Sequence, residues 1–141
     1  RVVQFDSLQQ AADAMWAVSG SFGPHTPAQW LELSRHMVKP VPGSATAVTL
    51  HYDPAIAVPF GALTRETAAQ GEAMLWQLYD AIQAQTLLLR GAESDLLSHE
   101  TALQMTARGP KARLVEFAGV GHAPTLIAAD QVDTVVRFLL D

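Results

Sequence analysis

The sequence predicts an α/β protein in which a short parallel sheet is flanked by helices and preceded by a mainly helical region. Two apolar runs, TLLLR at residues 86–90 and RLVEF at residues 113–117, have the length and composition of buried strands. The helical pattern HETALQMTAR separates them. Strands that alternate with helices are typical of a parallel sheet. We expect the helical region over residues 1–70 and the α/β region over residues 71–141.

The first helix is expected directly after the start of the chain. Apolar residues recur at helical spacing from Leu8 to Trp16. Asp6 or Ser7 can cap the exposed amides at its start, and the helix should end near Gly20. Because the chain begins with Arg1 rather than methionine, we also expect it to be a carboxyl-terminal fragment of a longer protein.

A second helix and a short strand complete the first region. The helix AQWLELSRHMV follows Thr26 as a cap and Pro27 in the first turn, and residues 39–43 should break it. The β-branched segment ATAVTLHYDP predicts a short strand closed by Pro54. Residues 55–69 are expected to be loop and turn.

Three helices flank the two buried strands of the second region. The segment GEAMLWQLYDAI, residues 71–82, is amphipathic and leads to the first strand. Ser98 can cap HETALQMTAR, which Gly109 and Pro110 end, and the last helix is expected over about residues 125–140.

The composition favours some classes of partner and excludes others. Hydrophobic residues make up 49%, charged residues only 16% and the mean hydropathy is +0.13, so we expect apolar faces that self-associate. A net charge of −5 with nine scattered basic residues disfavours nucleic acid and anionic membranes. The absence of cysteine excludes disulfides and thiolate metal sites. No apolar run reaches the roughly 20 residues of a membrane span, and we expect a soluble, cytoplasmic chain.

Asp95 and His122 are the candidate catalytic residues. Each lies just past one of the two apolar runs. Adjacent parallel strands lie about 4.8 Å apart and their carboxyl ends open on one edge of the sheet, so the two side chains can meet there. A carboxylate that accepts a hydrogen bond from an imidazole forms the acid and base half of a hydrolytic triad. Gly119 and Gly121 suit a loop that must turn tightly to aim the ring.

The segments RGAESDLLS and VEFAGVGHAP resemble the strand-then-acid and strand-then-histidine motifs of the α/β-hydrolase superfamily. Within it, the chain is most similar to bacterial cap-bearing esterases, meta-cleavage-product hydrolases and epoxide hydrolases. The resemblance implies that residues 1–70 form a helical cap and that HYDPAIAVPF returns the chain to the core. It also implies hydrolysis of an ester, an amide or a carbon–carbon bond next to a carbonyl in a small-molecule substrate, without a cofactor.

The nucleophile of that family does not occur in this chain. Its Gly-x-Ser-x-Gly motif places serine on a sharp turn between a strand and a helix. The nearest segment is SGSFG at residues 19–23, where Ser21 lacks the first glycine and follows a helix. We therefore expect the nucleophile upstream of this chain and the fragment alone to be inactive. An aspartate nucleophile, with His122 activating water, and a non-catalytic interaction module are the alternatives.

The candidate residues also have simpler interpretations. Asp95 or Glu93 can shape a turn and cap the next helix, and Glu93 is the alternative acid. His122 can be a loop histidine bonded to backbone. The remaining histidines lack the spacing of a metal site, although His99 can lie near Asp95.

Aromatic residues of the first region are candidates for substrate binding. Trp30 and Phe22 are the preferred residues for a cap pocket, because pockets for small molecules are mostly apolar. The alternative is plain core packing, since these residues fall on helical apolar faces. The same two interpretations apply to Met15, Trp16 and Trp76.

Overall fold

A computed structural model describes residues 3–140 of the chain. The chain divides into two compact units, with the boundary between Pro54 and Ala55. Within the described residues, every helix is too short or too polar to cross a bilayer. The assignment of residues 1–70 to a cap and residues 71–141 to a core stays a prediction.

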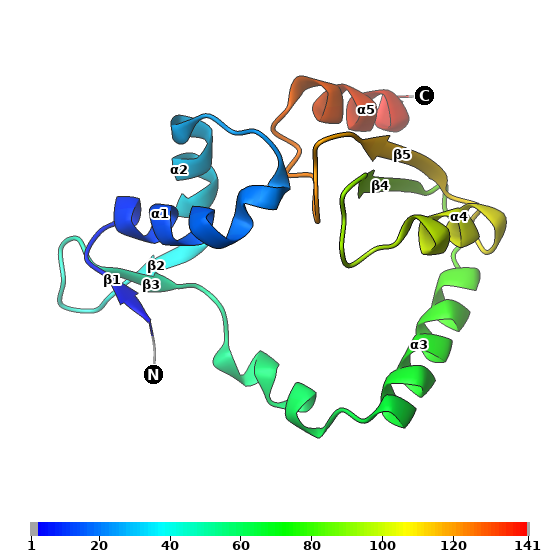
Figure 1. The fold of residues 1–141 in the computed structure, drawn as a ribbon, viewed down its shortest axis with the longest axis horizontal. Helices are drawn as coiled ribbons and strands as arrows, with labels where there is room; N and C mark the ends of the chain where they lie inside the picture. Colours follow the sequence, from blue (N-terminus) through cyan, green and yellow to red (C-terminus); the bar gives the residue numbers. More distant parts are fainter. Residues whose placement is uncertain (1–2, 141) are drawn as a thin grey trace. The chain divides into compact units, whose positions relative to one another are not determined.

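The first unit packs two helices against a small antiparallel sheet (Figure 1). Strand β3 is central, with β1 and β2 on its two sides. The core consists of Ala11, Ala12, Met15 and Trp30, and the Trp30 indole nitrogen donates to the Ala12 carbonyl oxygen at 2.8 Å. The elements are β1 (Gln4–Phe5), α1 (Leu8–Ser19), a 3-10 turn (Gly20–Phe22), α2 (Pro27–Arg35), β2 (Val38–Pro40) and β3 (Val48–Leu50).

Local capping explains where both helices begin. The Ser7 hydroxyl accepts a hydrogen bond from the Gln10 amide at 3.1 Å. Thr26 and Gln29 form a reciprocal capping box, and Pro27 occupies the first turn of α2. These two starts agree with the sequence prediction.

Two predictions for this unit are wrong. Val38 was expected to end the second helix and Lys39 to lie in a break, but both belong to β2, which pairs with β3. No strand was expected before the first helix, but Gln4–Phe5 forms β1 against β3. Both errors concern strands that are held by a partner distant in sequence.

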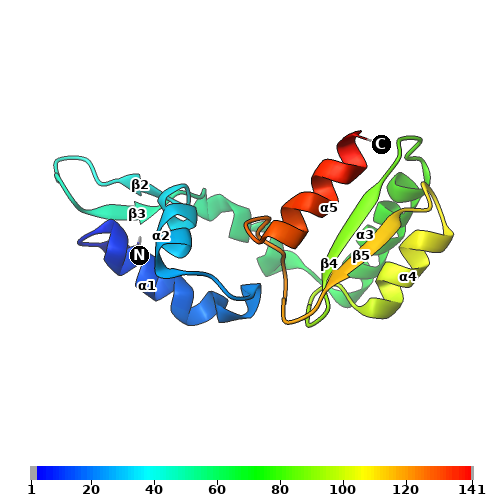
Figure 2. The same cartoon turned by 90° about the horizontal axis from the view of Figure 1, so that it is seen from above.

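The second unit contains two parallel strands between helices. Strands β4 and β5 pair in register from Leu87 with Arg113 to Gly91 with Phe117. Helix α5 lies on one side of this pair, and α3 and α4 lie on the other (Figure 2). The strands match the predicted runs to within one residue. The elements are 3-10 turns at Pro54–Ala57 and Pro59–Ala62, then α3 (Arg65–Asp80), β4 (Leu87–Gly91), α4 (His99–Ala107), β5 (Arg113–Phe117) and α5 (Ala129–Leu140).

Two helix starts differ from the prediction. Helix α3 begins at Arg65 rather than at residue 71, because Thr64 and Thr67 form a capping box there. Helix α5 begins at Ala129 rather than near residue 125. Leu126 has a φ of 60°, which no α-helix accommodates, and its amide donates to the Gln131 side chain at 2.9 Å.

Candidate functional site

The loops that follow β4 and β5 lie against each other. The Ala92 amide donates to the Phe117 carbonyl oxygen at 2.9 Å, and the Glu93 amide donates to the Val120 carbonyl oxygen at 2.9 Å. These bonds extend the pairing of the strands beyond their carboxyl ends. The loop that carries Asp95 and the loop that carries His122 are thereby held at one edge of the sheet.

Gly91 permits the close approach of the two loops. A Cβ atom built on it would lie 2.0 Å from the Gly121 carbonyl oxygen and 2.3 Å from the Val120 carbonyl oxygen. Gly119, in the same loop as His122, has a φ of 70°, the left-handed region that favours glycine. Two glycines therefore set the path of this loop.

His122 contacts Ser94, the residue before the predicted acid. The His122 Nδ1 atom lies 3.3 Å from the Ser94 Oγ atom. The same hydroxyl oxygen accepts a hydrogen bond from the Leu97 amide at 3.1 Å. Ser94 was not predicted as a site residue. Serine side chains often accept a hydrogen bond from a backbone amide a few residues later, as Ser94 does from Leu97.

Neither predicted carboxylate contacts His122. Asp95 is exposed, and within residues 3–140 no hydrogen bond or salt bridge joins it to the His122 ring. Glu93 is also exposed, and its backbone amide rather than its carboxylate reaches the histidine loop. The structure thus brings His122 to the loop of Asp95, where Ser94, the residue directly before Asp95, contacts the ring.

A buried arginine holds the loop that carries Ser94 and Asp95. The Arg90 side chain is 6% exposed. Its guanidinium donates to the Leu97 carbonyl oxygen at 2.7 Å and to the Ala92 carbonyl oxygen at 3.2 Å, with a longer contact of 3.4 Å to that of Ser94. It also forms a salt bridge with Glu116. In the sequence, Arg90 is recognisable only as the end of an apolar run.

Comparisons with known proteins place the chain in a family. No family model matches the sequence. The chain is 44% identical over 137 residues to a 3-hydroxybutyrate-oligomer hydrolase of Cupriavidus necator, which covers 96% of the chain and 47% of that protein. An α/β hydrolase from Novosphingobium aromaticivorans has a TM-score of 0.76 and 33% identity over 99% of the chain and 48% of its own. The chain belongs to the α/β-hydrolase superfamily.

The chain matches the carboxyl-terminal part of that fold. It spans about half the length of the proteins it resembles. An E-2-(acetamidomethylene)succinate hydrolase has the same fold, with a TM-score of 0.71 and 14% identity over 99% of the chain and 48% of that protein. The predicted fold class is confirmed.

The predicted substrate-binding residues lie in the first unit. Trp30 is only 5% exposed and belongs to the core. It also borders a cavity of about 210 Å³, together with Trp16 and His25. Phe22 packs edge-on against Trp30 with ring centroids 6.3 Å apart. A role of Trp30 and Phe22 in substrate binding stays a prediction.

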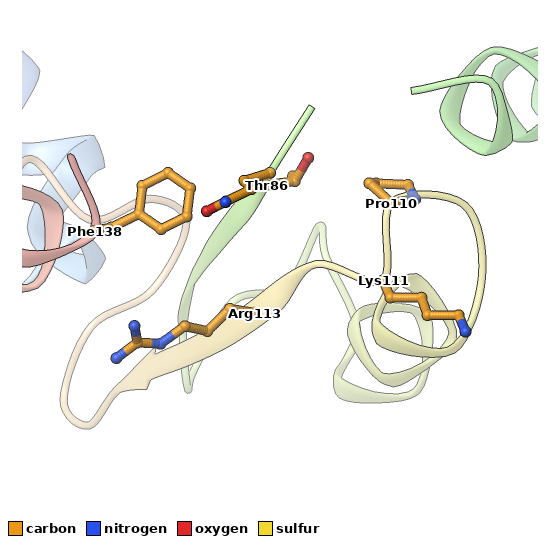
Figure 3. Close-up of a pocket in the computed structure, with 6 residues that line it drawn as sticks. Thr86, Pro110, Lys111, Arg113 and Phe138 are labelled. Carbon is orange, nitrogen blue, oxygen red and sulfur yellow. The ribbon is translucent and has the colours of Figure 1, made fainter. Parts of the chain in front are cut away.

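A second cavity lies away from the candidate site. Its volume is about 250 Å³, and Thr86 and Arg113 border it at the amino ends of β4 and β5 (Figure 3). Ser94 and His122 follow the carboxyl ends of the same strands. Since ligands of open α/β sheets bind outside the carboxyl ends, this cavity is no part of the candidate site.

The other histidines are dispersed. His25 contacts the Gly23 carbonyl oxygen at 2.8 Å, His36 lies 3.8 Å from the Glu32 carboxylate, and the His99 ring lies 3.0 Å from Glu116. Within the part of the chain that the structure describes, no three histidine or carboxylate side chains gather as metal ligands. His99 bonds to the partner of Arg90 and not to Asp95.

The lowered pKa of Glu116 leads us to expect that the stability of the fold depends on pH. Its hydrogen bonds from His99 first and Arg90 second lower the pKa of Glu116 below its ordinary value. A carboxyl group with a lowered folded-state pKa stabilises the fold above its unfolded-state pKa, and this contribution is lost as the pH falls through the folded-state value. Thermal unfolding should therefore show stability falling with acidification below about pH 4.5, and less steeply in Glu116→Gln.

The matched control for this prediction is Glu100→Gln. Glu100 is an exposed carboxylate on α4 that forms no ion pair within residues 3–140. It should keep the wild-type profile of melting temperature against pH. Identical profiles for Glu116→Gln and the wild type would contradict the role given to the Glu116 carboxylate.

Proposed function

We propose that this chain supplies the histidine and the acid of a Ser-His-Asp hydrolase whose nucleophile lies upstream of Arg1. The observation that carries the proposal is the contact between the loops after β4 and β5, which brings His122 Nδ1 within 3.3 Å of Ser94, next to Asp95. The membership in the α/β-hydrolase superfamily supports it.

The proposed reaction needs His122 as general base and then general acid. The serine hydroxyl of the upstream segment attacks the carbonyl carbon, and His122 Nε2 takes its proton. His122 then gives the proton to the leaving alcohol, which leaves an acyl-enzyme. Water attacks the acyl-enzyme with His122 again as base, the acyl–serine bond breaks, and His122 returns the proton to the serine oxygen as the carboxylic acid is released. Backbone amides outside this chain bind the oxyanion.

Asp95 is the proposed partner of His122 Nδ1. A carboxylate at this nitrogen holds the imidazole in the required tautomer and stabilises the imidazolium. Ser94 Oγ is at that nitrogen in the structure, and Asp95 is the next residue. Exposed side chains change rotamer within nanoseconds, so an exposed Asp95 can turn toward the ring once the upstream segment covers the site.

An ester of a hydroxy acid is the proposed substrate. The relative with 44% identity is named as a hydrolase of 3-hydroxybutyrate oligomers. Such oligomers have an ester bond next to an apolar methyl-bearing unit. Trp30 and Phe22, in the first unit of the protein, are proposed to line an apolar pocket for the methyl-bearing part of the substrate.

An ester-hydrolysis assay tests the proposal. Residues 1–141 alone and a longer protein that contains them should be tested with a short-chain chromogenic ester and with 3-hydroxybutyrate oligomers. We expect no turnover by residues 1–141, since they lack the nucleophile elbow. We expect turnover of both substrates by the longer protein. A longer protein with an intact serine elbow and no activity on any ester would refute the proposal.

The upstream sequence decides between two nucleophiles. A Gly-x-Ser-x-Gly segment after an apolar strand supports serine chemistry. An aspartate in place of that serine supports the alternative of an epoxide hydrolase or dehalogenase type, in which His122 activates water in the second step.

Self-association of residues 1–141 is the second candidate property, and helix α3 favours it. No residue of α3 is buried, and Met74, Leu75 and Leu78 are each more than half exposed. Apolar patches of this kind mark contact surfaces. We expect sedimentation to show dimers or larger species at high concentration and Leu75→Glu to shift the population toward monomer. A monomer for the wild type at all concentrations would contradict this expectation.

A further inference from the structure

We propose that Arg90 is a positioning residue for the catalytic histidine: it shapes the loop of residues 92–97, which carries both Ser94 and Asp95 beside His122. The contacts of Arg90 are observed in the structure, whereas their effect on catalysis rests on the function proposed above. Arg90 touches no reacting atom, so it acts through the loop.

The Arg90 guanidinium bonds to one face of the loop at several points. Nε donates to the Leu97 carbonyl oxygen at 2.7 Å, and Nη1 donates to the Ala92 carbonyl oxygen at 3.2 Å. Nη2 lies 3.4 Å from the Ser94 carbonyl oxygen. The planar guanidinium has five donors in fixed directions, so it can serve three carbonyl groups at once. The first, middle and last residues of the loop are thus held by one rigid group.

Glu116 holds Arg90 in place from the neighbouring strand. Arg90 of β4 and Glu116 of β5 are partners in the parallel register, and their side chains form a salt bridge. The Arg90 side chain is 6% exposed and that of Glu116 is 28% exposed, so this pair is more shielded from water than a surface pair. Removal of one partner of a shielded pair is costly because the other charge stays unpaired.

The Ser94 hydroxyl connects the held loop to His122. It accepts from the Leu97 amide at 3.1 Å and lies 3.3 Å from His122 Nδ1. Both ends of this turn, the Ser94 and Leu97 carbonyl groups, are in contact with Arg90. A displacement of the turn therefore moves the hydroxyl away from the ring.

Nuclear magnetic resonance of residues 1–141 tests the positioning role without reference to activity. The variants are Arg90→Gln and Arg90→Lys, with Arg113→Gln as the control, because Arg113 is exposed and begins β5 at the opposite end of the sheet. In both Arg90 variants, we expect the Glu93 and Leu97 amides to exchange about tenfold faster or more. We also expect the cross-peaks between the Ser94 β-protons and the His122 ring to weaken.

Lysine should not rescue these signals, because an ammonium group keeps the charge but cannot reach the three carbonyl groups together. Arg113→Gln should leave them unchanged. Wild-type exchange and cross-peaks in a folded Arg90→Gln or Arg90→Lys variant would overturn the proposal. If neither folds, Glu116→Gln must speed exchange of the same amides, and wild-type exchange in that variant overturns the proposal equally.

The activity of a longer protein separates this proposal from the proposed function. If that function is correct, Arg90→Lys should lower kcat about tenfold or more and leave KM within about twofold, because the loop positions the base and does not bind substrate. If amide exchange changes in the Arg90 variants but the longer wild-type protein is inactive, the result counts against the proposed function and not against the positioning contacts. Changed exchange with a wild-type kcat would overturn the catalytic part of the inference.

Discussion

Replacement of His122 by alanine is expected to lower kcat for ester hydrolysis at least about a thousandfold in a protein that contains this chain and the upstream serine. The reason is that His122 moves the proton in both halves of the proposed reaction. Its ring follows β5 and is held near the loop of β4, where the carboxyl ends of parallel strands meet. Steady-state kinetics with a short-chain chromogenic ester measure the effect.

His36→Ala is the control for this substitution. The His36 side chain is 78% exposed in the first unit and lies 3.8 Å from the Glu32 carboxylate of α2. We expect its kcat to stay within about twofold of wild type, as for most surface substitutions. Comparable activity of His122→Ala and the wild type would show that another group is the base.

Three further variants identify which residue bonds to His122 Nδ1 in the active protein. Asp95→Asn should lower kcat by about 10²- to 10⁴-fold, since an amide cannot stabilise the imidazolium. Glu93→Gln should have a small effect, because its carboxylate makes no contact with the ring. A large loss in Ser94→Ala together with full activity in Asp95→Asn would assign the bond at Nδ1 to Ser94 in the active protein as well.

The sequence predicts the elements whose signals are local. Ser7, Thr26 and Ser98 each cap the helix expected of them, because a side-chain oxygen and an amide three residues later suffice for the bond. The strands around Leu88 and Val115 are recognisable from their continuous apolar runs. In contrast, Val38–Pro40 becomes a strand only through its pairing with β3, which no local pattern encodes.

The candidate site was only partly predictable for a similar reason. Strand order and the positions of Asp95 and His122 predict that their loops meet, since strand ends in a parallel sheet share one edge. Which side chain contacts the ring depends on the path of each loop. The role of Ser94 depends on Arg90, whose charge inside an apolar run is paired by Glu116 on the neighbouring strand.

Gly91→Ala is expected to destabilise the second unit by about 1–3 kcal/mol, because its methyl group would overlap backbone atoms. The added Cβ would lie 2.0 Å from the Gly121 carbonyl oxygen and 2.7 Å from the Val120 carbonyl carbon. Backbone atoms cannot rotate away as a flexible side chain does, so the two loops must separate. The bond from the Glu93 amide to the Val120 carbonyl oxygen should then break. Urea denaturation of residues 1–141 measures the loss.

The same substitution should also reduce catalysis more than the loss of stability explains. Misplacement of a catalytic group by about 1 Å can cost about a hundredfold in rate, and His122 directly follows Gly121, whose carbonyl must move. Gly71→Ala is the matched control, because Gly71 lies inside α3 with no atom within 4 Å of the added Cβ. It should stabilise the chain by up to about 1 kcal/mol, since alanine is the better helix former. Equal stability and kcat for Gly91→Ala and the wild type would mean that the loops need not touch for the histidine to work, which removes the geometric basis of the site.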